Sequence, residues 1–578
     1  MKPRRSFLFA SGVVAWVLVL AGPGRAAEPC AELLRLVPDD VGLCFVIRDL
    51  RNYSQLLRDA PFWADFRQSP LGKELVDSPE IRKLGRALEQ VSEHLGISWE
   101  RLRDDILGDA IVLAYRPGPP DRPELEEGMI LVHARDPQLL RQLVNRLDQL
   151  QRASGELKEL QPRSAHGRDY VRRIKTKGED FLFVHGSVLV LSGQETLLRR
   201  ALERDRTMPP ADQEVPLIAA QLEKLKAGSA LAAVWLNPRA FDAAFQRRAA
   251  AATADDRAFL TAFGRYWKAL EGVVAYAQPA AHLEIGLSLR VDWQQLPESA
   301  RRLFSTASQP SPLWQVFPED ALLAAAVQID WLAAVQTLGE FLPESVRGTI
   351  QGTAKRIAGP ALGRDIAKEV LPYLGPECGV CIVAPPRTDR DWFPQMVSAL
   401  RVRDDGPGAP LSSTLLAGLH SLAVLAVLDY NSKHPTQAVL RSSLQGKVEV
   451  RSLVHPSLPS GWQLSFAFKE GYLLLASSPD AIQRFSAPKN STPSSAADEV
   501  PLLRISVTAL RAYLRERQGA LVPFLATQRQ ISRDEAQQQL ERWYAALQWV
   551  DRIEITQQAS SNQVTFRLRL HTSQRLVK

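Results

Sequence analysis

Two stretches of the chain carry the same pattern of apolar and polar positions. Residues 181–202, FLFVHGSVLVLSGQETLLRRAL, place short apolar runs on both sides of a glycine and then change to helical spacing. Residues 464–485, LSFAFKEGYLLLASSPDAIQRF, do the same. Short apolar runs predict strands, and glycine tolerates the positive φ of a two-residue hairpin turn. Each stretch therefore predicts a tight hairpin that leads into a helix.

With six further pairs of stretches, these two form a series of seven that recurs in the same order along the chain, at separations between 267 and 285 residues. The matched residues include Pro38 with Pro318, Gly167 with Gly446, Gly186 with Gly471 and Gly272 with Asp551. An ordered series of this kind predicts a tandem duplication. We expect a first copy at residues 36–293 and a second at 314–572, joined by a polar linker at 294–313.

Each copy is predicted to combine short strands with helices. Residues 78–96 place apolar side chains at helical spacing, and Ser192 with Glu195, like Ser477 with Asp480, has the spacing of a helix cap. Short turns between consecutive strands make neighbouring strands antiparallel, whereas a parallel sheet needs long crossovers. The predicted fold class is therefore α+β, with two tandem homologous α/β repeats, each having a mainly antiparallel sheet and packed helices.

The first 26 residues predict an export signal. Basic residues precede an apolar run at 7–20, and small residues lead to a cleavage site after Ala26. The run is too short for a membrane span and is followed by Gly-Pro-Gly. The opening RRSFLF resembles a twin-arginine signal, so that route and the general secretory route both stay open. We expect an exported protein of the bacterial periplasm or cell envelope.

Charge argues against nucleic acid as a partner. The 578 residues carry a formal net charge of +7, and the four basic residues of the predicted signal account for more than half of it. For a mature chain of this length, a net charge near +3 gives no electrostatic case for nucleic acid as a partner. Hydrophobic residues at 45% and charged residues at 23% are typical of folded globular domains.

The cysteines invite a redox or metal interpretation that the context opposes. Cys378 and Cys381 form a CGVC motif inside GPECGVCIVAP, which reads as a strand. A redox pair normally begins a helix, and a zinc site needs two further ligands that no matching pair supplies. We therefore expect either buried strand cysteines or one structural disulfide.

Other candidate chemistry does not recur between the predicted copies. His133 corresponds to Arg401, His185 corresponds to Glu470, and the chain has no HExxH, GxSxG or Walker phosphate loop. Several polar residues do recur, and we interpret them as turn, cap or ion-pair positions: Asp39–Asp40 with Glu319–Asp320, Arg135–Asp136 with Arg403–Asp404, and Arg239 with Arg511. We assign no catalytic, cofactor-binding or metal-ligating residue, and no cofactor.

Residues Ser413 to Tyr430, STLLAGLHSLAVLAVLDY, are almost wholly apolar and could span a membrane. Their counterpart in the first copy, DPQLLRQLVNRLDQLQR, is amphipathic. We therefore predict a helix within a soluble domain and no transmembrane helix in the mature chain, with Ser413 to Tyr430 as the one exception that stays open. Its apolar surface needs a partner, and the first copy, another subunit and a hydrophobic ligand all stay open. For the protein as a whole we expect a hydrophobic ligand or an envelope protein as partner.

Three matched segments resemble an uncharacterised family of large exported bacterial proteins, a domain of unknown function, here in two tandem copies. They are VPDD at 37–40 with FPED at 317–320, VHARD at 132–136 with LRVRD at 400–404, and residues 467–485. The resemblance implies export and no assigned activity. We expect a non-catalytic binding or scaffold protein of the envelope; the alternatives are an envelope hydrolase with an unfamiliar site and a membrane-associated complex subunit.

Overall fold

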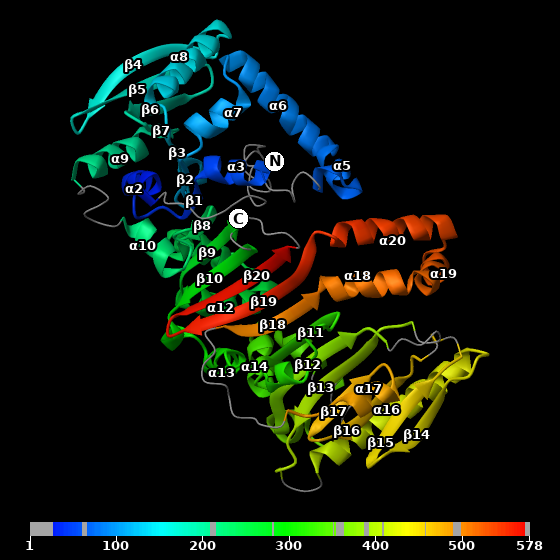
Figure 1. Ribbon diagram of the computed structural model, residues 1–578. Coiled ribbons are helices and arrows are strands. Elements are labelled where there is room, and N and C mark those ends of the chain that lie inside the picture. Colours follow the sequence, from blue (N-terminus) through cyan, green and yellow to red (C-terminus); the bar gives the residue numbers. More distant parts are fainter. Residues whose placement is uncertain are drawn as a thin grey trace. The chain divides into compact units, whose positions relative to one another are not determined.

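The computed structural model describes residues 27–59, 66–207, 216–279, 282–350, 352–353, 363–385, 392–406, 410–456, 458–459, 461–488 and 499–572. The predicted signal at 1–26 lies outside the described residues. Helices and antiparallel strands are mixed along the chain (Figure 1). The predicted α+β class with mainly antiparallel sheet is therefore confirmed, as is the helix predicted at 78–96.

Two compact units divide the chain. Unit 1 comprises the described residues of Met1–Ala251, Leu270–Asp292 and Asn562–Lys578, and unit 2 comprises those of Ala252–Ala269 and Trp293–Ser561. The predicted linker contains a helix, α13 (Glu298–Ala307), which contacts α14 (Trp331–Glu340) within unit 2. The boundaries of the tandem copies stay a prediction.

The sheet of unit 1 has the strand order β4-β5-β6-β7-β3-β2-β1-β8-β9-β10-β20. Its strands are β1 (Leu43–Arg48), β2 (Ala110–Arg116), β3 (Glu127–His133), β4 (Leu157–Ala165), β5 (Arg168–Lys175), β6 (Glu179–His185), β7 (Val188–Ser192), β8 (Ala232–Leu236), β9 (Leu270–Pro279), β10 (Leu283–Val291) and β20 (Gln563–Thr572).

Helices cover both faces of this sheet. They are α2 (Ala27–Leu36), α3 (Leu50–Asp59), α5 (Pro70–Val76), α6 (Pro79–Leu95), α7 (Trp99–Arg101), η1 (Leu102–Ile106), η2 (Pro123–Leu125), α8 (Pro137–Ala153), α9 (Glu195–Thr207), α10 (Leu217–Lys224), η3 (Pro238–Phe241) and α11 (Asp242–Ala250). The main core lies where α2, α9 and α10 bury leucines against β2, β3 and β7. On the other face, Leu140 of α8 and Ile106 of η1 pack on Val132.

The sheet of unit 2 has the strand order β14-β15-β16-β17-β13-β12-β11-β18-β19. Its strands are β11 (Leu323–Gln328), β12 (Leu374–Val383), β13 (Gln395–Val402), β14 (Val439–Gln445), β15 (Val448–Val454), β16 (Leu464–Lys469), β17 (Tyr472–Ala476), β18 (Val500–Ser506) and β19 (Val550–Ser560). This is the order of the first nine strands of the unit 1 sheet, when β11 is counted as β1.

The remaining helices belong to unit 2. They are α12 (Ala254–Ala269), η4 (Trp293–Gln295), α13, η5 (Pro312–Gln315), α14, η6 (Ile366–Val370), η7 (Leu371–Tyr373), α16 (Leu411–Lys433), α17 (Pro479–Arg484), α18 (Val507–Glu516), α19 (Gln518–Arg529) and α20 (Arg533–Leu547). Ile482 of α17 packs on one face of the sheet with Val450 and Leu474, and Leu411 of α16 packs on the other with Val402.

Both predicted hairpins are present, but their strand registers correct the glycine match by one residue. β6 and β7 are joined by the turn 186–187, and only Gly186 has a positive φ (57°). β16 and β17 are joined by the turn 470–471, where both residues have positive φ. A type II′ turn needs positive φ at its first central residue and a type I′ turn at both, so glycine suits either position. The pairing therefore aligns His185 with Lys469, not with Glu470.

The β4–β5 and β14–β15 hairpins also differ in turn type. Here the turn of unit 1 has positive φ at both residues, and the turn of unit 2 has it at one. His166 and Gly167 both have positive φ, whereas in the turn 446–447 the positive φ belongs to Gly446. Ala165 therefore corresponds to Gln445 by strand register, and the match of Gly167 with Gly446 is one residue out.

The predicted helix caps are also corrected. Helix α17 is capped by Ser478, whose hydroxyl accepts a hydrogen bond from the N–H of Ala481, whereas the Ser477 hydroxyl accepts one from Met396 in β13. In unit 1, Ser192 accepts from the N–H of Gln194, one residue before α9. The α17 cap therefore lies one residue after the predicted Ser477, and Ser192 bonds to the chain just before α9 rather than to the first turn of that helix.

Candidate binding pocket

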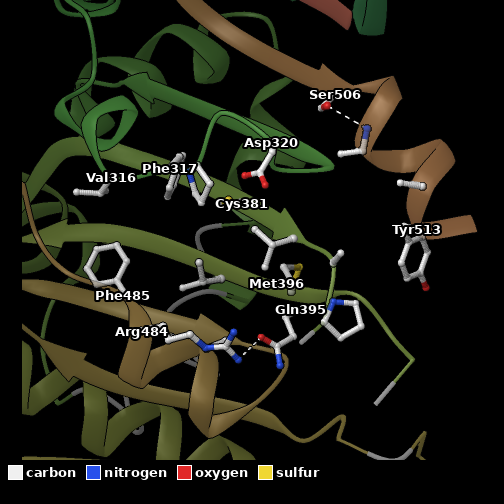
Figure 2. A pocket seen from close by; sticks show the side chains of 18 of the residues that line it. Val316, Phe317, Asp320, Cys381, Gln395, Met396, Arg484, Phe485, Ser506 and Tyr513 are labelled. Carbon is white, nitrogen blue, oxygen red and sulfur yellow. Dashed lines mark hydrogen bonds between the residues drawn. The ribbon is translucent and has the colours of Figure 1, made fainter. Parts of the chain in front are cut away.

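A pocket of about 850 Å³ opens in unit 2 beside β12 and β13 (Figure 2). Its lining is mostly apolar and comes from the turn before β11, the ends of β12 and β13, helix α17 with the residues after it, and helix α18. The apolar lining residues include Val316, Phe317, Pro318, Val383, Pro385, Met396, Val397, Phe485, Ala509 and Ala512. A hollow of this size and character is typical of small-molecule binding sites.

Polar side chains also line the pocket, among them Asp320, Gln395, Arg484, Ser506, Thr508 and Glu516. Figure 2 shows Arg484 and Asp320 on opposite sides of it. Arg484 donates a hydrogen bond to the side-chain carbonyl oxygen of buried Gln395, and no carboxylate of the described residues forms an ion pair with it. The hydroxyl of Ser506 is occupied as the cap of α18, since it accepts from the N–H of Ala509. The guanidinium of Arg484 is therefore the group best placed to meet the polar end of a ligand.

The thiol and phenol of the pocket are held in their neutral forms. Burial raises the pKa of Cys381 to about 11, so its thiol is protonated at neutral pH and is a weak nucleophile. Burial also raises the pKa of Tyr513 to about 12, and its hydroxyl donates to the carbonyl of Trp392 at 2.9 Å. The thiol of Cys381 and the phenol of Tyr513 are therefore uncharged lining groups at neutral pH.

The CGVC motif lies within strand β12, as predicted. Cys378 pairs with Val327 and Cys381 with Ala324 of β11, and residues three apart on a strand point to opposite faces. All four cysteines are free thiols, of which Cys378 is half-buried and the others are buried. Of the two predicted alternatives, strand cysteines describe the structure and a disulfide does not.

An ion-pair cluster in unit 1 surrounds His133, which ends β3. Its Nδ1 lies 3.2 Å from Asp109 Oδ2 and its Nε2 lies 3.5 Å from Glu32 Oε2, while Arg51 also pairs with Asp109. Burial lowers the pKa of His133, but the hydrogen bonds to Asp109 and Glu32 outweigh burial and raise that pKa to about 9. Both ring nitrogens have acidic partners, so the imidazolium is a structural cation. Sequence reasoning missed this cluster because its members lie on separate elements.

The recurring acid pairs lie in turns, as predicted. The N–H of Val41 donates to the carbonyl of Pro38, and that of Ala321 to the carbonyl of Pro318. The first pair also holds α9, because Asp40 receives two hydrogen bonds from Arg200, at 3.1 and 2.6 Å, and Asp39 pairs with Arg204.

The other recurring polar residues also have structural contacts. Asp136 caps α8, and Asp404 accepts from the N–H and hydroxyl of Ser412 at the start of α16. Arg239 pairs with Asp242, and Arg511 pairs with Asp551. In the part of the chain that the structure describes, no group of three or more His, Cys, Asp or Glu residues could hold a metal ion.

The apolar segment Ser413 to Tyr430 lies within helix α16. Among the described residues, α16 is one helix long and apolar enough to cross a membrane. It packs on β14 and β16, yet Leu425 and Leu428 remain 62% and 60% exposed. The exposed side of α16 is therefore a second candidate contact surface in unit 2.

Comparisons with known proteins do not assign the chain to a family: no family model, no curated protein and no solved structure matches it. The resemblance to an uncharacterised exported family stays a prediction. The pocket and the exposed surfaces of unit 2 are therefore the features that bear on function.

Proposed function

We propose that the chain is an exported, non-catalytic binding protein of the bacterial cell envelope, built from two tandem copies of one α+β fold. The pocket of unit 2 binds an apolar or amphiphilic small molecule. The observation that carries this proposal is the apolar lining of a hollow of about 850 Å³ whose thiol and phenol stay neutral. Arg484 receives the polar end of the ligand.

The order of strands supports the duplication. Nine strands of each unit follow one another across the sheet in the same sequence, which chance would rarely produce for a sheet of this size. In each unit a five-residue π-helix precedes the second strand, η1 before β2 and η6 before β12. The π-helix is a rare conformation, so its recurrence at one place in the fold adds independent support.

A pocket-filling substitution tests the binding function. Ala512 is exposed and lines the pocket, so Ala512→Trp fills the hollow without disturbing the core. Ala240→Trp in unit 1 is the matched control, since Ala240 precedes Phe241, the sequence counterpart of Tyr513. The apolar fluorophore N-phenyl-1-naphthylamine should bind the mature protein and the Ala240→Trp variant. Binding to Ala512→Trp should fall at least tenfold; unchanged binding would contradict the proposal.

A membrane-associated subunit is the second candidate function, and the exposure of α16 favours it. Leu425 and Leu428 would enter the bilayer. Flotation of the mature protein with vesicles of phosphatidylethanolamine and phosphatidylglycerol tests this candidate. Flotation that Leu425→Glu with Leu428→Glu abolishes would support it, and recovery of all protein in the vesicle-free fraction would reject it.

A further inference from the structure

Strand β14 is the outer edge of the unit 2 sheet. It pairs with β15 and with no other strand of the described residues (Figure 1). Most of its side chains are exposed on both faces, including Leu444 at 74% and Val439 at 47%. An exposed edge strand presents unpaired N–H and C=O groups that another strand can satisfy. Native proteins usually block such edges with proline or charged side chains.

The corresponding edge of unit 1 is blocked in this way. The hairpin registers align Pro162 of β4 with Ser442 of β14, and Ser164 with Leu444. Proline has no N–H to donate, and β4 also exposes Lys158, Glu159 and Arg163. Strand β14 has an ordinary donor at Ser442 and a single charged residue, Arg441. The protection of this edge is thus present in unit 1 and missing in unit 2.

Apolar side chains surround the open edge. Arg451 of β15, which pairs with Ser442, donates to the carbonyl of Leu416 in α16, so this face of the hairpin points toward α16. Leu440 and Leu444 share that face because they alternate with Ser442 along the strand in steps of two. Asn431, near the end of α16, exchanges two hydrogen bonds with Ala438 just before β14.

We propose that β14 is the pairing edge for β14 of a second copy of this chain, in an antiparallel arrangement centred on Ser442. That register opposes Leu440 of one copy to Leu444 of the other. Arg441 opposes Ser443, so no like charges lie directly opposite each other. The two copies bury the exposed leucine pairs and satisfy both rows of backbone groups.

A second copy fits this surface better than a lipid bilayer does. An open sheet edge is not tolerated in hydrocarbon, because lipid cannot satisfy its backbone groups. The ion pair of Asp429 with Lys433, both more than 60% exposed, lies beside Leu428 and would also have to be desolvated. At a protein interface these charges remain at the wet rim.

Strand pairing of this kind already occurs once in the chain. Strands β10 and β20, the last strands of the two predicted copies, pair antiparallel in unit 1. Leu287 lies opposite Phe566. Because each predicted copy ends in one of these strands, the pairing relates the two copies by a near-twofold axis, as we infer for β14. The same fold therefore supports an edge-to-edge contact between homologous strands.

Sedimentation velocity of the mature protein tests the proposal. We expect a dimer at micromolar concentration and a monomer for Leu444→Lys, whose exposed side chain is not needed for folding. Ser164→Lys, the matched change in β4, should leave the dimer intact. A monomeric mature protein at 100 micromolar would overturn the proposal, as would a dimer that Leu444→Lys does not weaken at least tenfold.

A cross-link locates the contact independently of affinity. Ser442→Cys should form an intermolecular disulfide under mild oxidation, because the proposed axis brings the two Ser442 positions opposite each other. Pro162→Cys in β4 is the control and should stay uncross-linked. Equal cross-linking of both variants, or none at Ser442→Cys, would overturn the proposed register. Neither result bears on fluorophore binding, so the pocket and this interface can fail separately.

Discussion

The same place in the two sheets holds a buried charge in unit 1 and an apolar pair in unit 2. Beneath α8, Arg173 of β5 is almost fully buried and pairs with Asp148 of α8 and with Asp180, opposite it on β6. Strand register puts Leu453 and Leu464 at the corresponding positions beneath α16. The two helices therefore pack on sheets of opposite chemical character.

This difference accounts for much of the apolar sequence of α16. A helix over a charged sheet position needs polar side chains on its inner face, as α8 supplies with Asp148 and Gln151. A helix over leucines gains most from apolar ones. Leu425 and Leu428 of α16 remain exposed, so the packing on the sheet does not use them. A segment has the same hydrophobicity whether it packs on an apolar sheet, forms a protein interface or enters a membrane.

The largest predicted effect comes from breaking the buried charge cluster of unit 1. Arg173→Leu leaves Asp148 without its buried partner and leaves Asp180 with Lys175 alone, so we expect the free energy of unfolding to fall by about 3 kcal/mol. Urea denaturation measures this loss. Arg173→Leu combined with Asp180→Leu reproduces the unit 2 pair and should recover at least half of it. A double variant as unstable as the single one would show that the two positions do not correspond.

The next effect is a pH dependence confined to unit 1. Because the folded pKa of His133 is raised to about 9, its stabilisation is complete below about pH 6.5, the ordinary histidine value, and is lost as the pH rises through 9. Because the site is only partly buried, solvent screening limits this stabilisation to about 1–2 kcal/mol. His133→Gln should flatten the unfolding free energy between pH 6.5 and 9. Arginine side chains do not titrate in this pH range, so Arg401→Gln at the corresponding position of unit 2 should not alter that pH dependence.

Direct titration provides the check on this assignment. The imidazole resonances of His133 in NMR spectra should titrate with a midpoint near pH 9. A midpoint near pH 6.5 would contradict the ion pairs of His133 with Asp109 and Glu32.

A smaller effect tests the corrected hairpin register. Gly446 has a φ of 62°, so Gly446→Ala should cost about 1 kcal/mol through backbone strain. Lys447→Ala, one residue later, should cost less than half as much because the positive φ belongs to the first turn residue. Thermal unfolding compares the two variants, and an equal cost at both positions would contradict the turn assignment.

The smallest effect is a gain. His166 occupies the first position of a turn in which both residues have positive φ. His166→Asn creates the Asn-Gly sequence that such turns favour most, so we expect a gain of about 0.5 kcal/mol. Calorimetry of this variant should show a higher unfolding temperature, and a lower one would contradict the proposed turn geometry.

Sequence patterns predicted the elements and the antiparallel class, because apolar periodicity and turn glycines are local properties. They placed Gly186 on Gly471 because glycine was the visible marker, but primed turns accept glycine at either position and only backbone pairing reveals which. The His133 cluster and the pocket around Cys381 were not predictable, since their members come from elements far apart in the chain. Arg173 was also missed, because a buried arginine in a strand resembles an exposed one until its partners are known.

Native mass spectrometry of the mature protein purified from its own cells tests whether the pocket of unit 2 binds an apolar or amphiphilic molecule. We predict a mass above that of the polypeptide, with a lipid or other amphiphile released on denaturation. The additional mass should disappear in Ala512→Trp and persist in Ala240→Trp. A protein that carries no additional mass, or whose ligand survives Ala512→Trp, would contradict the account.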